Sequence, residues 1–285
     1  MTRYLVTGAR GMLGTDLTLA LAGRDVTALG RSDLDITDRA AVDAAVAGHD
    51  VVINAAAFTR VDDAETHESE ARATNATGAG LLADAARRND ARLVQISTDY
   101  VFDGTATSPY AEDAPRHPVS AYGRTKAEGE ELVLAAHPKG SFIVRTAWLY
   151  GAHGPNFAKT MRRLAVDRAE LAVVNDQLGQ PTWTRDLAQA LVAMLDADAP
   201  VGIYHGTNSG QASWFDFARA VFTEARLDPE RITATDSASF LRPAPRPAYS
   251  VLGHDAWGRA GLEPLRDWRA ALREAAKSGA TDPAV

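Results

Sequence analysis

The N-terminal glycine-rich segment constrains the fold of this chain more than any other. An apolar run at residues 4–7 leads into GARGMLG at residues 8–14, and an apolar, helix-prone stretch follows. This order predicts a strand, a tight turn and a helix, a unit in which the backbone can approach a pyrophosphate at the helix N-terminus. Because the spacing is G-x-x-G-x-x-G and not G-x-G-x-x-G, a glycine turn without a ligand is the alternative interpretation.

Strand and helix patterns continue to alternate through the first half of the chain. Apolar runs at residues 25–29, 50–54, 92–96 and 141–146 are separated by stretches of helical character. This alternation predicts an α/β fold, a Rossmann doubly wound parallel sheet in which ligands bind beyond the carboxyl ends of the strands. The pattern loosens after residue 150 and predicts a smaller, discontinuous α/β substrate-binding lobe. We expect the Rossmann domain to comprise 1–150 plus about 179–212, and the lobe about 151–178 plus 213–285.

The end of the second predicted strand bears on the choice of cofactor. In an NAD-specific site, an acidic residue usually closes this strand and binds the ribose 2′-hydroxyl. Gly30 and Arg31 stand there instead, and an Arg pairs well with a 2′-phosphate. The sequence therefore favours NADPH, while NADH stays open because Arg31 is equally well explained as a solvated loop charge.

Tyr122 and Lys126 are the candidates for proton transfer. Their Y-x-x-x-K spacing places both side chains on one face of the helix predicted from residue 122 to 136. A neighbouring ammonium favours the phenolate, so we expect Lys126 to lower the pKa of Tyr122 toward neutrality. The competing interpretation is that both residues belong to an ordinary helix face. The catalytic interpretation is favoured only if a cofactor site and a substrate site lie nearby.

Composition narrows the classes of partner. The net charge of −7 argues against nucleic acid or an anionic membrane as the main partner. Cysteine is absent and the seven His residues show no metal-ligand spacing, so we expect no metal. Apolar runs are shorter than ~18 residues and no signal-peptide pattern opens the chain, so we expect a cytoplasmic protein.

The run RPAPRP at residues 242–247 is a separate feature of the C-terminal part. Its alternating prolines exclude a regular helix or an inner strand. Arg242 and Arg246 on a stiffened loop could meet a diphosphate. An ordinary surface loop explains the same residues equally well.

The glycine turn, Ser97-Thr98-Asp99 and the Tyr122–Lys126 pair are accompanied by several longer motifs. Taken together, these motifs make the chain resemble the dTDP-4-dehydrorhamnose reductase family of extended short-chain dehydrogenases/reductases. The resemblance runs from residue 8 to about residue 252. Its motifs are NAAAFTRVDDAE at 54–65, STDYVFDG at 97–104, RTAW at 145–148, NFAKTM at 156–161, DQLGQPT at 176–182 and RPAYSVL at 246–252.

The resemblance implies that NAD(P)H delivers a hydride to C4 of a dTDP-4-dehydro-6-deoxy-L-sugar, converting dTDP-4-dehydro-L-rhamnose to dTDP-L-rhamnose. Tyr122 would be the general acid, Lys126 would hold the nicotinamide ribose, and Thr98 would bond the keto oxygen. Asp99, Trp148 and Asn156 would join Thr98 in contacting the substrate. The cofactor-binding residues would be Gly8, Gly11, Met12, Leu13, Gly14, Arg31, Asp35, Ile36, Ala57, Phe58, Thr59, Ile96, Tyr122 and Lys126.

Some members of this family hold Mg²⁺ through glutamates at a dimer interface. The nearest position here is Asp16, for which the sequence offers no partners, so the expectation of no metal stands and a homodimer is left open. Three other functions remain as alternatives. They are a reductase of another dTDP-4-keto-deoxysugar (dihydrostreptose-type or of secondary metabolism), a sugar-nucleotide epimerase on the same scaffold, and an NADP-binding regulatory subunit. Tyr100 argues against a 4,6-dehydratase, which carries Glu at this place.

Overall fold

The computed structural model describes residues 1–283 and is built around a six-stranded parallel sheet. Its strand order is β2-β1-β3-β4-β5-β10. The order of addition reverses between β1 and β3, and ligands of such sheets bind at the carboxyl ends beside that reversal. The predicted α/β Rossmann sheet is therefore confirmed. The strands are β1 Arg3–Thr7, β2 Asp25–Leu29, β3 Val51–Asn54, β4 Arg92–Thr98, β5 Ser141–Thr146 and β10 Gly202–His205.

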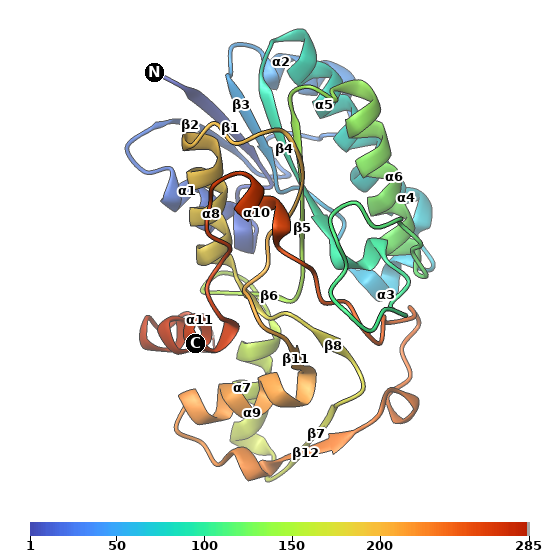
Figure 1. Cartoon of the computed structure of the whole chain (residues 1–285), viewed down its shortest axis with the longest axis vertical. Helices are drawn as coiled ribbons and strands as arrows, with labels where there is room; N and C mark the ends of the chain where they lie inside the picture. Colours follow the sequence, from blue (N-terminus) through green and yellow to red (C-terminus); the bar gives the residue numbers. More distant parts are fainter. Residues whose placement is uncertain (284–285) are drawn as a thin grey trace.

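Helices cover both faces of this sheet (Figure 1). The inner strands are apolar without alternation because both of their faces are buried. Val6 belongs to the apolar cluster that contains Leu17 and Leu191, whereas Leu5 belongs to the cluster that contains Leu82. One face carries α1 Met12–Ala20 and α8 Thr184–Asp196, and the other carries α2 Arg39–Val46, α5 Ala79–Arg88 and α6 Ala121–Ala136.

The C-terminal half of the chain returns to complete the sheet. The strand β10 pairs with β5 at one edge. Trp257 of α10 (Asp255–Arg259) is fully buried in the sheet-face cluster that contains Val6. Its indole N–H donates to the His205 carbonyl over 2.8 Å. The sheet core is thus assembled from both ends of the chain.

A further apolar cluster, separate from those on the two sheet faces, lies below the sheet in Figure 1. Its helices are α7 Phe157–Asp167, α9 Trp214–Glu224 and α11 Trp268–Lys277. Three two-stranded sheets accompany them, β6 Leu149–Tyr150 with β9 Thr182–Trp183, β7 Leu171–Val174 with β12 Ile232–Thr235, and β8 Leu178–Gly179 with β11 Ala212–Ser213.

Short helical segments follow the third and fourth sheet strands, where the candidate residues lie. A long helical stretch runs over residues 68–88, and a π-helical turn interrupts it. The short elements are α3 Val61–Ala64, α4 Glu68–Arg72, the π-helix η1 Ala73–Gly78, and the 3-10 helices η2 Asp99–Val101, η3 Pro229–Arg231 and η4 Ser237–Ser239.

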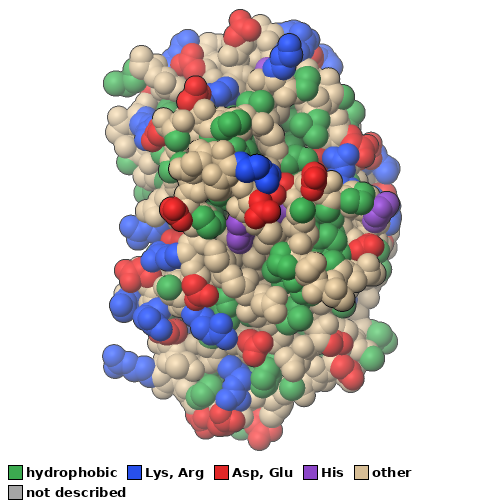
Figure 2. Space-filling view, in the orientation of Figure 1, with side chains coloured by type: hydrophobic (Ala, Val, Ile, Leu, Met, Phe, Trp, Pro, Cys, Tyr) green, Lys and Arg blue, Asp and Glu red, His purple; other side chains and the backbone are tan. Residues whose placement is uncertain are grey.

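The surface is mixed in character. Acidic and basic side chains are interspersed with apolar ones over the face drawn in Figure 2. Within residues 1–283, no helix combines the length and the apolar character that crossing a membrane requires.

Candidate active site

The glycine turn between β1 and α1 lies at the reversal of the sheet. Gly8 has φ +67°, and a Cβ there would come within 2.6 Å of the Ala55 carbonyl carbon beyond β3. A Cβ on Gly14 would lie 2.1 Å from the Gly8 oxygen. Gly11 caps α1 without a side-chain hydrogen bond, so the first N–H groups, including those of Met12 and Leu13, stay available to an anion. The turn therefore fits the pyrophosphate of a dinucleotide.

Beyond β2, the structure adds a cation that the sequence analysis did not single out. The side chain of Arg10 passes so close to Gly30 that a Cβ at position 30 would lie 2.8 Å from its Cδ. Its guanidinium donates to the Ser32 hydroxyl over 2.9 Å and pairs with Asp33 at 2.9 Å. Arg31 is exposed beside it. Two cations thus flank the end of the strand that an acidic residue would close in an NAD-specific site.

The predicted adenine contacts, Asp35 and Ile36, follow this strand end. The Asp35 carboxylate accepts bonds from the Thr37 backbone and hydroxyl at 2.9 and 2.7 Å. These bonds hold the pKa of Asp35 below its usual value. The Ile36 side chain is buried against Gly78, where a Cβ would come within 2.8 Å of it.

The segment Ala57-Phe58-Thr59 follows β3 and is fixed by Asn75. The Asn75 side chain accepts from the Phe58 N–H at 2.8 Å and donates to the Phe58 carbonyl at 3.1 Å. It also donates to the Thr125 hydroxyl of α6 at 3.1 Å. Asn75 sits in the π-helix η1, and such turns occur frequently at functional sites. This role of Asn75 was not predictable from the sequence, because a π-turn leaves no mark in the helical periodicity.

Tyr122 and Lys126 lie in the first turns of α6, as predicted. Lys126 is buried, and its ammonium donates to the Ile96 carbonyl over 2.6 Å. Burial lowers the pKa of Lys126 to about 8, against the opposing charge of Glu130. Burial also raises the pKa of Tyr122 to about 12, while hydrogen bonding to Thr98 opposes the rise. Lys126 is not among the groups that shift the Tyr122 pKa, and desolvation sets the direction, so the expected lowering of this pKa by Lys126 is not seen in this structure.

Thr98 and Asp99 stand at the carboxyl end of β4, beside Tyr122. The Thr98 hydroxyl donates to the Asp99 carboxylate over 3.0 Å and accepts from the Tyr100 N–H at 3.2 Å. Burial raises the pKa of Asp99 to about 6. The rings of Tyr100 and Tyr122 meet edge to face, 5.6 Å apart. A hydroxyl, a carboxyl and a phenol therefore converge where the sheet's strands end.

A buried ion pair secures α6 to the strands β4 and β5. Glu130 lies one turn beyond Lys126 and accepts from the Ser97 hydroxyl at 2.6 Å. Arg145 of β5 donates to both Glu130 oxygens at 2.9 and 2.8 Å, and Arg116 adds a bond of 3.2 Å. Burial opposes the charge, but these bonds keep the pKa of Glu130 below its usual value. The sequence signal for this pair is a charged residue, Glu130, followed one turn later by apolar positions on the same helix face.

Trp148 follows β5 in a strained backbone conformation. Its φ is +45°, and its ring stacks on Trp214 of α9 with centroids 3.6 Å apart and planes 9° from parallel. A Cβ on Gly179 would lie 2.6 Å from the same indole. Trp214 of α9 and Gly179 of β8 therefore hold the indole of Trp148 in place beyond the end of β5.

Asn156 is engaged by its own surroundings. Its side-chain oxygen caps α7 by accepting from the Lys159 N–H at 3.1 Å. Its amide donates to the Gly151 carbonyl over 2.9 Å. The structure thus places Asn156 as the helix cap of α7, beyond β6.

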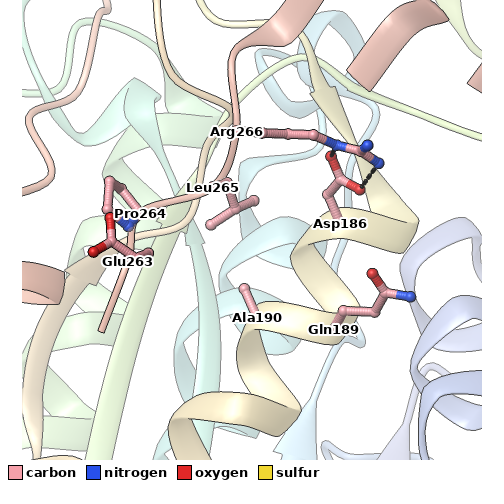
Figure 3. Close-up of a pocket in the computed structure, with 7 residues that line it drawn as sticks. All are labelled: Asp186, Gln189, Ala190, Glu263, Pro264, Leu265 and Arg266. Atoms are coloured by element: carbon pink, nitrogen blue, oxygen red, sulfur yellow. Dashed lines mark hydrogen bonds and ion pairs between the residues drawn. The ribbon is translucent and has the colours of Figure 1, made fainter. Parts of the chain in front are cut away.

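A hollow of about 310 Å³ lies away from these residues, between α8 and the segment before α11. Asp186 and Arg266 line it, and Figure 3 shows the two side chains joined by hydrogen bonds of 2.8 and 2.6 Å. Asp186 also accepts from the Asn208 amide at 2.9 Å, so its oxygens are occupied within the fold. None of the residues predicted for the site lines this hollow.

The matching family model spans nearly the whole chain. The model described as "RmlD substrate binding domain" matches residues 2–280. The chain belongs to this family. Its match extends over the clusters on the two sheet faces and the cluster below the sheet, so the residues around Tyr122 and the stacked Trp148 lie inside one family unit.

Relatives of this RmlD-family chain carry related names. A Streptomyces griseus protein named dTDP-4-dehydrorhamnose reductase is 53% identical over 280 residues, covering 95% of this chain and 92% of its own. A Streptomyces antibioticus protein named probable dTDP-4,6-dihydroxy-2-methyloxan-3-one 4-ketoreductase is 52% identical over 278 residues, covering 96% and 94%. The crystal structure of Bacillus anthracis dTDP-4-dehydrorhamnose reductase in complex with NADP aligns with TM-score 0.94 at 36% identity, covering 98% of this chain and 100% of its own.

Proposed function

We propose that this protein is an NAD(P)H-dependent reductase of the C4 keto group of dTDP-4-dehydro-L-rhamnose, forming dTDP-L-rhamnose. The observation that carries the proposal is the convergence of Thr98, Tyr122 and Lys126 beside a dinucleotide-type glycine turn. Membership of the RmlD family and the names of its relatives support the substrate class. NADPH is the proposed cofactor, supported by the NADP complex of the Bacillus anthracis relative and by Arg10 and Arg31 beside Gly30.

The residues proposed to bind the cofactor follow one another from the glycine turn to Tyr122 and Lys126. The N–H groups of α1 would hold the pyrophosphate, and the cofactor would supply the hydride when bound. Ile36 would flank the adenine, while Phe58 and Ile96 would border the nicotinamide half. The remaining proposed contacts are Gly8, Gly11, Met12, Leu13, Gly14, Arg31, Asp35, Ala57, Thr59, Tyr122 and Lys126.

We assign proton donation to Tyr122. Because its pKa is raised to about 12, the phenol keeps its proton at neutral pH and releases it only to a strong base, such as the alkoxide formed at C4. Thr98 is placed to bond the same oxygen. Lys126 supplies a cation beside the nicotinamide ribose, and Asp99 and Trp148 border the sugar.

One further candidate function has a specific observation in its favour. The Streptomyces antibioticus relative is named as a 4-ketoreductase of a different dTDP-linked sugar. Reduction of another dTDP-4-keto-deoxysugar therefore stays as the second proposal, with the same residues in the same roles.

The deciding experiment offers the purified protein dTDP-4-keto-6-deoxyglucose with NADPH or NADH, with and without a 3,5-epimerase. Formation of dTDP-L-rhamnose only when the epimerase is present supports the first proposal. A different sugar formed without the epimerase supports the second. No net oxidation of NADPH at 340 nm in either arm excludes reduction of the two 4-keto sugars tested and favours an epimerase.

We propose the two-domain division of 1–150 plus about 179–212 and about 151–178 plus 213–285, with one amendment. Segment 255–265 is returned to the sheet domain, because Trp257 and Leu265 belong to the sheet's apolar cluster. A cytoplasmic location and a homodimer complete the proposal, and size-exclusion chromatography with light scattering tests the latter.

A further inference from the structure

The contact between Lys126 and β4 is repeated one turn further along α6. The Lys126 ammonium donates to the Ile96 carbonyl, and the Ser97 hydroxyl donates to the Glu130 carboxylate, each over 2.6 Å. Lys126 and Glu130 are four residues apart and both are buried, so their side chains lie on one face of the helix. Two consecutive residues of β4 therefore hold a cation and a carboxylate next to each other.

The acceptor of the Lys126 ammonium is itself fixed in place. The Gln95 amide also donates to the Ile96 carbonyl, over 2.8 Å, and the Gln95 oxygen accepts from Asn54 of β3 at 2.7 Å. Both lone pairs of the Ile96 carbonyl are thus used. An ammonium has three donors, and with one of them on this carbonyl the others can meet the ribose hydroxyls of the proposed cofactor.

Glu130 supplies the charge that compensates the buried ammonium. Burial lowers the pKa of Lys126 to about 8, and the negative charge of Glu130 opposes that fall. Burial also works against the charge of Glu130, but hydrogen bonds from Arg145 and Ser97 hold its pKa below the usual value. The carboxylate is therefore ionised wherever Lys126 is charged near neutral pH.

The other charged groups around α6 have partners of their own. Arg145 of β5 and Arg116 of the preceding loop bond the Glu130 carboxylate, and burial keeps the nearby His205 of β10 neutral by lowering its pKa to about 3. At the end of β4, Asp99 accepts from Thr98. Glu65, which follows α3, accepts from the Ala121 N–H. The side chains of α4 and α5 form surface pairs, which are Glu68–Arg124, Arg72–Glu128, Asp84–Arg87 and Arg88–Asp43.

We propose that Glu130 is a positioning residue of the reduction, and that its carboxylate acts through Lys126 as the counter-charge of the buried ammonium. The inference rests on the proposed function, in which this ammonium holds the nicotinamide ribose. Arg145 and Arg116 keep the carboxylate ionised and in place. The ion pair that joins α6 to β4 and β5 thus also serves the charge of the active site.

Carbon-13 NMR of the lysine side chains, followed from about pH 6 to pH 11, reads the charge of Lys126 directly. The chain has four lysines, at 126, 139, 159 and 277, and Lys126→Arg identifies the signal. In Glu130→Gln, the Lys126 signal is expected to titrate about one pH unit lower than in the wild type. Glu131→Gln is the matched control, because Glu131 is exposed and also pairs with Arg116, and it should leave the titration unchanged.

A double variant separates the loss of Glu130 from the cation that this loss leaves behind. In Glu130→Gln alone, Arg145 has no counter-charge and also repels the ammonium. Glu130→Gln combined with Arg145→Met removes both charges, and an apolar residue in place of a buried ion is often compatible with the fold. The lower titration point is expected to persist in this variant. The thermal midpoint of each variant reports whether the fold is intact.

Three results would overturn the inference. They are an unchanged Lys126 titration in Glu130→Gln, a return to the wild-type titration in the double variant, and an equal change in the Glu131→Gln control. The second result would assign the effect to the uncompensated Arg145.

The pH dependence of kcat/KM connects the pair to the reaction. Its descending limb near pH 8 should move to lower pH in Glu130→Gln by the same interval as the lysine signal. A limb that stays in place while the lysine signal moves rejects the positioning role. If the wild-type protein reduces neither 4-keto sugar, the proposed function fails, while the lysine titration still decides whether Glu130 is the counter-charge of Lys126.

Discussion

The ammonium of Lys126 donates to the main-chain carbonyl of Ile96 over 2.6 Å. This bond ties the helix that carries Tyr122 to the strand that carries Thr98. It also keeps a cation inside the protein, where burial lowers the pKa of Lys126 to about 8.

Activity should therefore fall as the pH rises through about 8, since the ammonium loses its proton there. Tyr122, with a pKa raised to about 12, stays protonated over the same range and does not cause the loss. Measurement of kcat/KM between about pH 6 and pH 10 checks this. In Lys126→Arg the cation persists to high pH, so the descending limb should disappear from the range. A limb that stays in place in this variant would assign it to another group.

Tyr122→Phe removes the proton donor while keeping the ring. We expect kcat to fall by about 10²- to 10⁴-fold, with dTDP affinity unchanged. Single-turnover oxidation of NADPH at 340 nm measures the first quantity and calorimetry the second. Turnover near the wild-type rate would reject Tyr122 as the acid.

Gly30→Asp should reverse the cofactor preference. The new side chain would begin 2.8 Å from Arg10 Cδ, displace that cation, and set a carboxylate against the 2′-phosphate. The KM for NADPH should rise by about tenfold or more while NADH is used at least as well as before. Arg39→Ala, which removes an exposed cation on α2 paired with Asp84, is the control. An unchanged NADPH to NADH ratio in Gly30→Asp contradicts the assignment.

Glu130→Gln should destabilise the protein by about 3–5 kcal/mol, because it leaves Arg145 buried without its counter-charge. Urea denaturation measures the free energy of unfolding. Glu131→Gln is the matched control. The Glu131 side chain is 62% exposed and pairs with Arg116 at 3.2 Å, so its loss should cost at most about 1 kcal/mol. Equal effects of the two substitutions would show that the buried pair is not the main contributor.

Trp214→Ala should raise the KM for the keto sugar by about 3- to 10-fold. This factor corresponds to the free energy that a stacked aromatic pair contributes. The stack holds Trp148 at φ +45°, and without it the indole can leave the substrate side. Near-UV circular dichroism should lose the signal of the stacked pair. Phe215→Ala, on the same helix, should leave both quantities near wild type. A normal KM in Trp214→Ala would separate the stack from substrate binding.

Features that depend on neighbouring residues were predictable from the sequence. The glycine turn and the parallel strands follow from local patterns, and the i to i+4 spacing placed Tyr122 and Lys126 on one helix. The spacing did not reveal that both groups are desolvated, so the direction of the Tyr122 pKa shift was missed.

Contacts between distant segments were not predictable. Arg246 meets Asp62 and Tyr100, and Trp148 meets Trp214, only because the C-terminal half folds back over the strand ends. Arg10 was missed for a related reason, since its place beside β2 depends on the turn's path and on the missing side chain of Gly30.

Burial of Trp257 in the sheet core has a consequence for biosynthesis. The indole and the strand β10 come from the last third of the chain. A nascent chain that has emerged only as far as β5 therefore carries five strands with an unpaired edge and an apolar face that α8 and α10 have yet to cover. Such surfaces bind chaperones or aggregate. The Rossmann sheet of this protein can be completed only after most of the chain has left the ribosome.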